Sequence, residues 1–140
     1  MPSIGIINCH SGLLPDYRGC SCVEWAIYND DPVGATCHFV DSGIDTGPTI
    51  IKREMEIYEG EHYFGIRNRM IYHQAGVIRD SVKAILEGFR REHAEKHPKG
   101  PYYKPMKDQS LIKTVEEKIE DGSYSHLKRK EWCWKTRRFK

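Results

Sequence analysis

The first part of the chain alternates short apolar runs with polar or glycine-rich stretches, a pattern typical of strands joined by loops. Apolar runs at residues 4–7, 35–41 and 49–56 predict three strands. Between the first two runs, residues 21–28 contain enough apolar positions for about two helical turns. The polar residues 29–32, which end in a proline, stop this helix.

From residue 59 onward, apolar residues recur at three- and four-residue steps, which indicates amphipathic helices. A long helix is predicted from residues 59–61 to Gly88, roughly 25 residues or about 38 Å in length. Residues 93–101 predict a linker, and residues 110–121 a second helix. The apolar positions of the long helix are Ile66, Met70, Ile71, Val77, Ile78, Val82, Ile85 and Leu86, with Gln74 in the same series.

Strands followed by helices predict an α/β fold built in layers. Three short strands are few for so long a helix to cover, so we expect this sheet to be part of a larger one. The length of 140 residues favours a single domain, and the formal net charge of +2 gives no electrostatic case for binding nucleic acid or a membrane. The longest apolar runs fall short of the roughly 20 residues that cross a bilayer.

The cysteines bear on both location and metal binding. Five cysteines, an odd number, in a chain without a visible secretory signal predict reduced thiols and a cytoplasmic location. Cys20-Ser21-Cys22 and Cys37-His38 have the wrong spacing for a zinc knuckle, and a second close cysteine pair is absent from the sequence. No metal is therefore expected.

The C-terminal residues 128–140 carry seven Lys or Arg against one acid, interleaved with Trp132, Trp134 and Phe139. Such a tail could stack on bases and contact phosphates. A solvated, partly docked terminus is the favoured interpretation, because a run of charge alone is weak evidence. Nucleic-acid binding is therefore the alternative that the sequence disfavours.

Polar residues that can carry acyl-transfer chemistry follow the first two predicted strands. Asn8 and His10 come directly after the first, while His38 lies in the second and Asp41 and Asp45 follow it. An amide can polarise a carbonyl, an imidazole can move a proton, and a carboxylate can set the charge of the imidazole. Each also has a structural alternative: loop capping for Asn8, a buried backbone-bonded imidazole for His38, and turn formation for the two acids.

Two segments, residues 7–19 and 35–48, resemble the N10-formyltetrahydrofolate-dependent formyltransferase family. The family signature is Asn-x-His followed by Ser-Leu-Leu-Pro-x-Tyr-Arg-Gly, then Thr-x-His and a loop of the form Asp-x-Gly-x-Asp-Thr-Gly. The resemblance extends over about residues 4–88, and Tyr102-Tyr103-Lys104 is similar to a segment of sugar N-formyltransferases. The matching positions are Asn8, His10, Leu13, Leu14, Pro15, Tyr17, Arg18, Gly19, Thr36, His38, Asp41, Gly43, Asp45, Thr46 and Gly47.

The resemblance implies roles for particular residues. Asn8 would stabilise the oxyanion of the tetrahedral intermediate, and His10 would act as general base or, as imidazolium, help to hold the oxyanion. Asp45 would support His10 and relay a proton through water. The formyl donor would be N10-formyltetrahydrofolate, whose pterin would be received by a loop made of Asp41, Ser42, Gly43, Ile44 and Asp45. His38, Leu14 and Pro15 would be supporting residues.

The resemblance also implies a partial formyltransferase-type sheet whose N-terminal nucleotide-fold half is absent. Residues 1–105 would form the C-terminal part of the catalytic domain, and residues 106–140 a short helix and a basic aromatic tail. We expect an exposed sheet edge and an apolar helix face, which a homodimer or a separate N-terminal half would cover. Ser11-Gly12 departs from the usual spacer before Leu-Leu-Pro, and Gly12 is expected to loosen this loop.

The acceptor amine is less well defined by the resemblance. Tyr17-Arg18-Gly19, Trp25 and Tyr102-Tyr103 favour the amine of an amino-sugar nucleotide. A glycinamide ribonucleotide formyltransferase is the alternative, and the methionyl-tRNA branch would need a further C-terminal barrel. A non-catalytic truncated relative with a basic nucleic-acid-binding tail is the competing class of function.

Overall fold

An antiparallel sheet with strand order β1-β3-β4 lies at the centre of the computed structural model, which describes residues 4–129. Two short parallel pairs, β2 with β6 and β5 with β7, lie outside this sheet. The strands are β1 (Ile7–His10), β2 (Arg18–Gly19), β3 (Gly34–Phe39), β4 (Thr49–Glu54), β5 (Ile57–Tyr58), β6 (Tyr102–Tyr103) and β7 (Leu127–Lys128). The helices are α1 (Cys22–Tyr28), α2 (Tyr63–Leu86), α3 (Gln109–Glu120) and the short 3-10 helix η1 (Arg91–His93).

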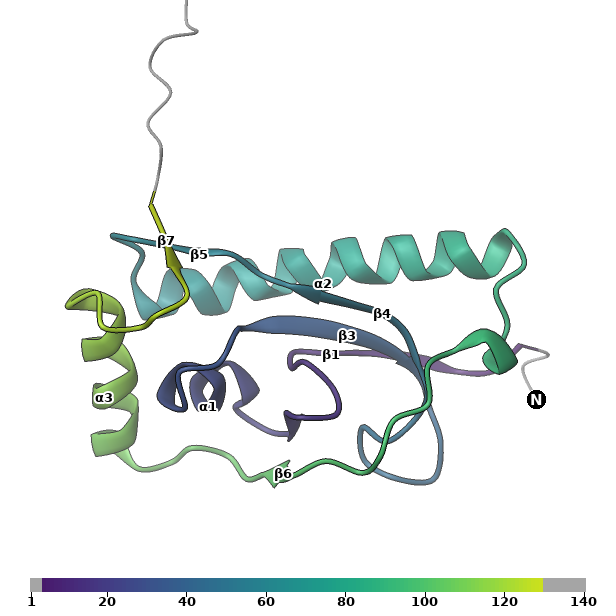
Figure 1. Ribbon diagram of the computed structural model, residues 1–140, viewed down its shortest axis with the longest axis horizontal. Helices are drawn as coiled ribbons and strands as arrows, with labels where there is room; N and C mark the ends of the chain where they lie inside the picture. The colour runs from purple at the N-terminus through teal and green to yellow at the C-terminus, as the bar shows by residue number, and fades with distance from the viewer. Residues whose placement is uncertain (1–3, 130–140) are drawn as a thin grey trace, which may run out of the picture.

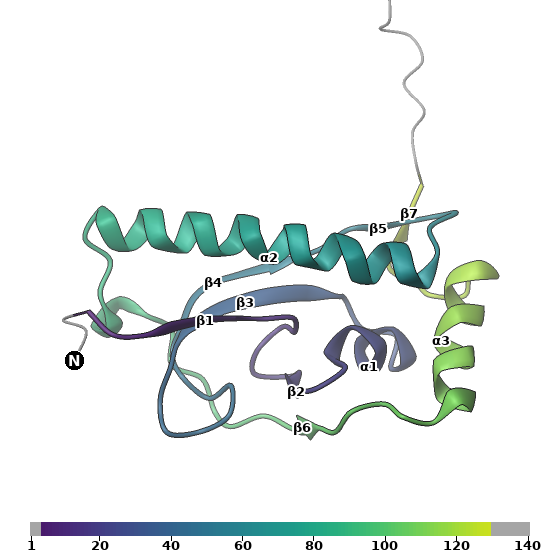
Figure 2. The same cartoon turned by 180° about the vertical axis from the view of Figure 1, so that it is seen from behind.

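The central strand β3 is buried along its whole length, because it has neighbouring strands on both edges and layers on both faces. Figures 1 and 2 show α2 along one side of the sheet, with α1 and the β2–β6 pair on the other side. The α/β prediction is therefore confirmed. The loop that precedes β4 reaches back to β1 and β3, since Asp45 of this loop lies 3.6 Å from both His10 and His38.

One hydrophobic cluster joins the sheet to all three α-helices. It includes Ala35 and Cys37 of β3, Ile27 of α1, Val77 of α2 and Val115 of α3, each fully buried. Helix α3 thus packs in the same core as the sheet that carries the candidate residues. The predicted division of the chain at residue 105 stays a prediction.

The predicted helices are confirmed to within a few residues of each end, but the first strand is displaced. Residues 4–7 were expected to form it, whereas β1 begins at Ile7 and ends at His10. Ile4 and Ile6 are 42% and 60% exposed, so the apolar run precedes the paired part of the strand. Asn8 and His10 consequently project from β1 itself and do not follow it.

The apolar series of α2 divides into a buried and an exposed set. Ile66, Met70 and Val77 pack into the core, and Ser81 continues the same stripe. Neighbouring members of the series remain exposed, so the apolar spacing predicts a wider buried face than the helix has. The exposed members are Ile71, Ile78, Val82 and Leu86, and Phe64, which is outside the predicted series, is exposed as well. The expected exposed apolar helix face is present, and within residues 4–129 β1 pairs only with β3.

Two further expectations concern partners outside the protein. Within residues 4–129, the helices are too short or too polar to cross a bilayer. Of the basic tail, residues 130–140 lie outside the described part of the chain, and so do Trp132, Trp134 and Phe139. The alternative of nucleic-acid binding through this tail stays a prediction.

Candidate active site

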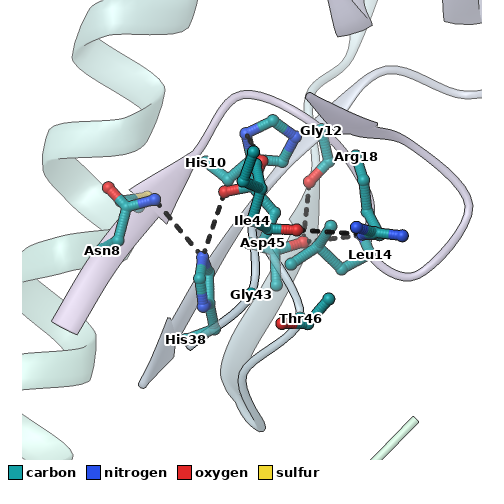
Figure 3. Close-up of polar contacts among 12 residues, drawn as sticks. Asn8, His10, Gly12, Leu14, Arg18, His38, Gly43, Ile44, Asp45 and Thr46 are labelled. Atoms are coloured by element: carbon teal, nitrogen blue, oxygen red, sulfur yellow. Dashed lines mark hydrogen bonds and ion pairs between the residues drawn. The ribbon is translucent and has the colours of Figure 1, made fainter. Parts of the chain in front are cut away.

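Neighbouring strands and one loop bring the candidate polar side chains together (Figure 3). Asn8 on β1 lies directly opposite His38 on β3, and His10 projects from the same face of β1 two residues later. The loop between β3 and β4 then folds back and places Asp45 between the two imidazoles. Asn8, His10, His38 and Asp45 therefore form one cluster, whereas Asp41, the fifth residue that the sequence singled out for acyl-transfer chemistry, bonds within its own loop.

Asp45 is the centre of this cluster. Its Oδ2 lies 3.6 Å from Nδ1 of His10, and its Oδ1 lies 3.6 Å from Nε2 of His38. Nδ2 of Asn8 lies 3.3 Å from the same His38 nitrogen. The two carboxylate distances exceed those of a direct hydrogen bond, so Asp45 acts on both rings mainly through its charge.

Backbone carbonyls determine which ring nitrogen of each histidine carries the proton. Nε2 of His10 lies 2.7 Å from the carbonyl oxygen of Tyr17, which can only accept a hydrogen bond. Nε2 therefore holds the proton of neutral His10, and Nδ1 keeps its lone pair toward Asp45. Nδ1 of His38 donates to the Phe39 carbonyl at 3.0 Å, which leaves Nε2 facing Asn8 and Asp45.

The surroundings shift the pKa values of the two histidines in opposite directions. Burial dominates for His10 and lowers its pKa, although the nearby Asp45 charge acts the other way. For His38 burial is opposed by the Asp45 carboxylate and the Phe39 carbonyl, which together raise its pKa. His10 is thus the imidazole held neutral, and His38 is the one that binds a proton more readily.

The carboxylate of Asp45 stays ionised because several donors outweigh its burial. Burial raises the pKa of Asp45, but His38, His10 and the backbone N–H of Gly19 together lower it below its ordinary value. The Gly19 N–H donates to Oδ2 at 3.0 Å. The site therefore holds a fixed negative charge beside one neutral and one readily protonated imidazole.

Arg18 braces the loop that carries Asp45, a role that the sequence did not reveal. Only 3% of Arg18 is exposed, and its Nε donates to the Ile44 carbonyl at 3.0 Å. Its Nη1 donates to the Gly100 carbonyl at 2.7 Å. The Tyr-Arg-Gly motif was the available signal, since it places this arginine immediately before Gly19.

The loop after β1 is packed tightly, which corrects the expectation that Gly12 loosens it. Gly12 is buried, and its carbonyl accepts a 2.8 Å hydrogen bond from Oγ1 of Thr36. A Cβ at residue 12 would lie 2.7 Å from Nε2 of His10. The same Thr36 hydroxyl accepts from the Leu14 N–H at 3.0 Å, and Leu14 is buried ahead of Pro15. The missing side chain at residue 12 is thus what lets His10 fit.

The loop expected to receive the pterin is largely exposed, from Asp41 through Ile44. Oδ1 of Asp41 accepts from the Gly43 N–H at 3.0 Å and from the Thr46 hydroxyl at 2.6 Å, so this carboxylate stabilises the turn. Ser42 and Ile44 are both exposed. A cavity of about 530 Å³ adjoins this loop, lined by Asp41, Thr46, Pro48, Arg91, Glu92, Lys96 and His97. It is large enough for part of a folate-sized ligand.

Metal binding finds no support in the geometry of residues 4–129. Across this part of the chain, groups of three or more His, Cys, Asp or Glu side chains that could hold a metal ion are absent. The imidazoles of the cluster instead face a carboxylate, an amide and backbone carbonyls. These groups can polarise a carbonyl and move a proton.

Comparison with known protein families agrees with the acyl-transfer chemistry that these side chains can carry. The formyl transferase family matches residues 1–79 of the chain. This chain belongs to the formyl transferase family. The matched residues include Asn8, His10, His38 and Asp45, so the whole cluster lies within the part of the chain that shows the family.

Methionyl-tRNA formyltransferases are among the relatives of known sequence. The chain is 32% identical over 112 residues to the enzyme of Acetivibrio thermocellus, covering 79% of this chain and 36% of that protein. It is 35% identical over 89 residues to the enzyme of Flavobacterium psychrophilum, covering 63% of this chain and 28% of that protein. The chain thus spans about a third of the length of the curated relatives it matches.

Solved formyl transferases share the fold. The formyltransferase PseJ from Anoxybacillus kamchatkensis, crystallised with UDP-4,6-dideoxy-4-formamido-L-AltNAc and tetrahydrofolate, gives a TM-score of 0.61 at 28% identity. That similarity covers 77% of this chain and 56% of PseJ. Phosphoribosylglycinamide formyltransferase from Bacillus halodurans gives 0.53 at 28% identity, covering 59% of this chain and 43% of that one. The partial formyltransferase-type fold is confirmed.

Proposed function

We propose that this chain carries a formyl-transfer site that moves the formyl group of N10-formyltetrahydrofolate to an amine. The observation that carries the proposal is the position of Asp45, whose two carboxylate oxygens each lie 3.6 Å from an imidazole of the cluster. Asn8 adjoins the same group. An ionised carboxylate, a neutral imidazole and a side-chain amide are the groups that transfer of an acyl group to an amine needs.

The residues would divide the chemistry as follows. Formation of the new C–N bond places negative charge on the carbonyl oxygen, which the Asn8 amide is positioned to stabilise. His10 has one unprotonated nitrogen, Nδ1, that can accept the proton released by the attacking amine. The Asp45 carboxylate stabilises the resulting imidazolium, and the proton finally replaces the formyl group on N10 of the departing tetrahydrofolate.

The lowered pKa of His10 supports one of the two roles inferred for it. A buried imidazole whose pKa is lowered is neutral near pH 7, the form required of a general base. The raised pKa of His38 makes this second ring the better candidate for a positive charge near the carbonyl oxygen. We therefore assign proton acceptance to His10 and charge stabilisation to His38 and Asn8.

The folate donor would lie along the loop from Asp41 to Asp45. The cavity of about 530 Å³ beside this loop falls within the range of small-molecule sites. Its wall combines the basic side chains of Arg91 and Lys96 with the apolar ring of Pro48. Asp41 and Glu92 line the same wall, so its charge is mixed, and Arg91 and Lys96 are the side chains that could pair with the acidic groups of N10-formyltetrahydrofolate, which supplies the activated one-carbon group.

The amine of an amino-sugar nucleotide is the favoured acceptor. Its support is the PseJ complex with a formamido sugar nucleotide, together with TM-scores of 0.59 for two further structures described as sugar N-formyltransferase or 4-N formyltransferase. An aromatic group adjoins the site in this chain, where the rings of Tyr17 and Tyr103 stack 5.1 Å apart. Glycinamide ribonucleotide and methionyl-tRNA are the alternative acceptors. The expected protein partner, a second copy of the chain or a separate N-terminal half, stays a prediction.

Formyl transfer can be tested directly on the purified chain. The chain is incubated with N10-formyltetrahydrofolate and, separately, an amino-sugar nucleotide, glycinamide ribonucleotide or methionyl-tRNA, and each product is examined by mass spectrometry. We expect a formylated sugar nucleotide. Formylation of another acceptor would overturn the assigned acceptor, and binding of folate without transfer to any amine would favour the non-catalytic alternative.

A further inference from the structure

Two cysteines face each other directly behind the candidate active site. Cys9 on β1 is the register partner of Cys37 on β3. Because side chains alternate along a strand, both thiols lie on the face opposite Asn8, His10 and His38. The proposed formyl transfer therefore gives this pair no role.

The hydrogen-bond pattern shows which kind of pair this is. The N–H of Val40 donates to the carbonyl of Ile6 at 2.8 Å, so Ile6 and Val40 form a hydrogen-bonded pair. Such pairs alternate along an antiparallel ladder, which makes Asn8 and His38 the next one. Cys9 and Cys37 then form a non-hydrogen-bonded pair, in which Cα atoms lie about 4.5 Å apart and side chains come closest. That separation lies within the range that a disulfide bridges.

The two thiols differ in access and in proton affinity. Cys37 is fully buried, whereas Cys9 is half-buried and its Sγ lies 3.7 Å from the Gln74 carbonyl of α2. A hydrogen bond with Cys9 lowers the pKa of the Cys37 thiol, and the adjacent Ser81 hydroxyl acts in the same direction against burial. The same contact, together with burial, raises the pKa of Cys9. The pair thus combines Cys9, which is partly exposed, with Cys37, which loses its proton more readily while both thiols are reduced.

We propose that Cys9 and Cys37 are a redox-modification site that closes into a reversible cross-strand disulfide. The oxidant is a low-molecular-weight disulfide. The Cys9 thiol gives up its proton and forms a mixed disulfide with one half of the oxidant, releasing the other half as a thiol. The Cys37 thiol, which lies directly opposite, then loses its proton as it attacks Cys9 Sγ, and the second half of the oxidant leaves as a thiol after taking up a proton.

Two protein thiols thereby lose two hydrogens and one oxidant disulfide becomes two thiols. The bond would tie β1 to β3 between the residues that carry the cluster, since Asn8 and His10 flank Cys9 and His38 follows Cys37. A transient disulfide of this kind is compatible with a reducing compartment, where protein disulfides serve mainly as redox signals. The proposal does not depend on the identity of the catalysed reaction.

The test uses the full chain and oxidised glutathione, followed by alkylation and peptide mapping without reduction. We expect a peptide pair linked through Cys9 and Cys37 that is lost on treatment with dithiothreitol. The matched control is Cys20→Ser, which removes an exposed cysteine and should leave the linked pair unchanged. In Cys37→Ser we expect Cys9 to stop at the glutathione adduct.

The exposed Cys20 also shows whether the oxidant has reacted with the protein. If Cys20 becomes fully glutathionylated while Cys9 and Cys37 are both alkylated, the proposal is wrong. A linkage of either cysteine to a different partner would equally overturn it. Should Cys37→Ser fail to fold, Cys9→Ser is the second variant. In it, Cys37 should not react with oxidised glutathione, and it should be alkylated only after the protein is unfolded.

Discussion

The backbone N–H of Gly19 donates a 3.0 Å hydrogen bond to Oδ2 of Asp45. This bond joins β2 to the loop between β3 and β4, across 26 residues of sequence, and the Arg18–Ile44 bond joins them a second time. Asp45 adopts a left-handed backbone conformation, with φ of 50°, which is uncommon for a residue with a side chain. The paired bonds offset this cost and fix the carboxylate between His10 and His38.

Replacing Arg18 with methionine should destabilise the protein, because it leaves the Ile44 and Gly100 carbonyls without their donor. We expect the free energy of unfolding to fall by about 1.5–3 kcal/mol, measured by urea denaturation. The control is Arg79→Met, whose side chain is 77% exposed and whose loss should change stability by less than about 0.5 kcal/mol. Equal effects of the two substitutions would contradict the bracing role of Arg18.

Gly12→Ala tests the close packing around His10. The added Cβ would lie 2.5 Å from the Tyr17 carbonyl oxygen and 2.7 Å from Nε2 of His10, so the imidazole must move. We expect a loss of about 1–3 kcal/mol in unfolding free energy and a shifted His10 ring resonance in NMR spectra.

The control for this substitution is Gly65→Ala in α2. Nothing lies within 4 Å of a Cβ at Gly65, and alanine is the better helix former. Its unfolding free energy should rise by about 0.5–1 kcal/mol. A Gly12→Ala protein with unchanged stability and an unmoved His10 resonance would disprove the packing argument.

Asp45→Asn should lower the pKa values of both His10 and His38, since the carboxylate raises each of them. NMR titration of the imidazole resonances measures both. In the unaltered protein, His38 is expected to titrate at higher pH than His10. Coincident titrations of the two rings, unaffected by Asp45→Asn, would contradict the assigned charges.

The same shifts give the pH dependence of stability a definite sign. The pKa of folded His38 is raised above 6.5, so its charge stabilises the protein below that pH and the contribution is lost as pH rises through the folded pKa. The pKa of folded Asp45 is lowered below 3.8, so its contribution is present above that pH and is lost as pH falls through the folded pKa. Asp45→Asn should remove both contributions.

Two neighbours on α2 test the division of its apolar residues. Met70 is 4% exposed and Ile71 is 65% exposed. Met70→Ala should reduce the unfolding free energy by about 2–5 kcal/mol, because it opens a cavity in the core. Ile71→Ala should change it by less than about 0.5 kcal/mol. Similar losses for both would mean that the exposed stripe of α2 is buried in solution.

The sequence predicted the helices well because their apolar spacing is local information. It misplaced β1 because Asn8 and His10 are polar, and only their long-range pairing with β3 shows that they belong to the strand. The resemblance to formyltransferases identified the cluster around Asp45. The Tyr-Arg-Gly motif marked Arg18, but its bracing role and the close packing at Gly12 could not be predicted, because each depends on contacts between segments that only the folded chain brings together.

The most direct test of the central claim is the rate of formyl transfer by Asn8→Ala and Asp45→Asn, measured by mass spectrometry with the amine that the unaltered chain formylates. Loss of one donor to a developing oxyanion typically costs about 100- to 1,000-fold in rate. We expect a loss of that order for Asn8→Ala, and about 100- to 10,000-fold for Asp45→Asn, which removes the charge that supports His10 as general base. Both variants should fold normally by circular dichroism, and the rate should be unchanged for Asp121→Asn at the end of α3. Full activity in either Asn8→Ala or Asp45→Asn would contradict the account.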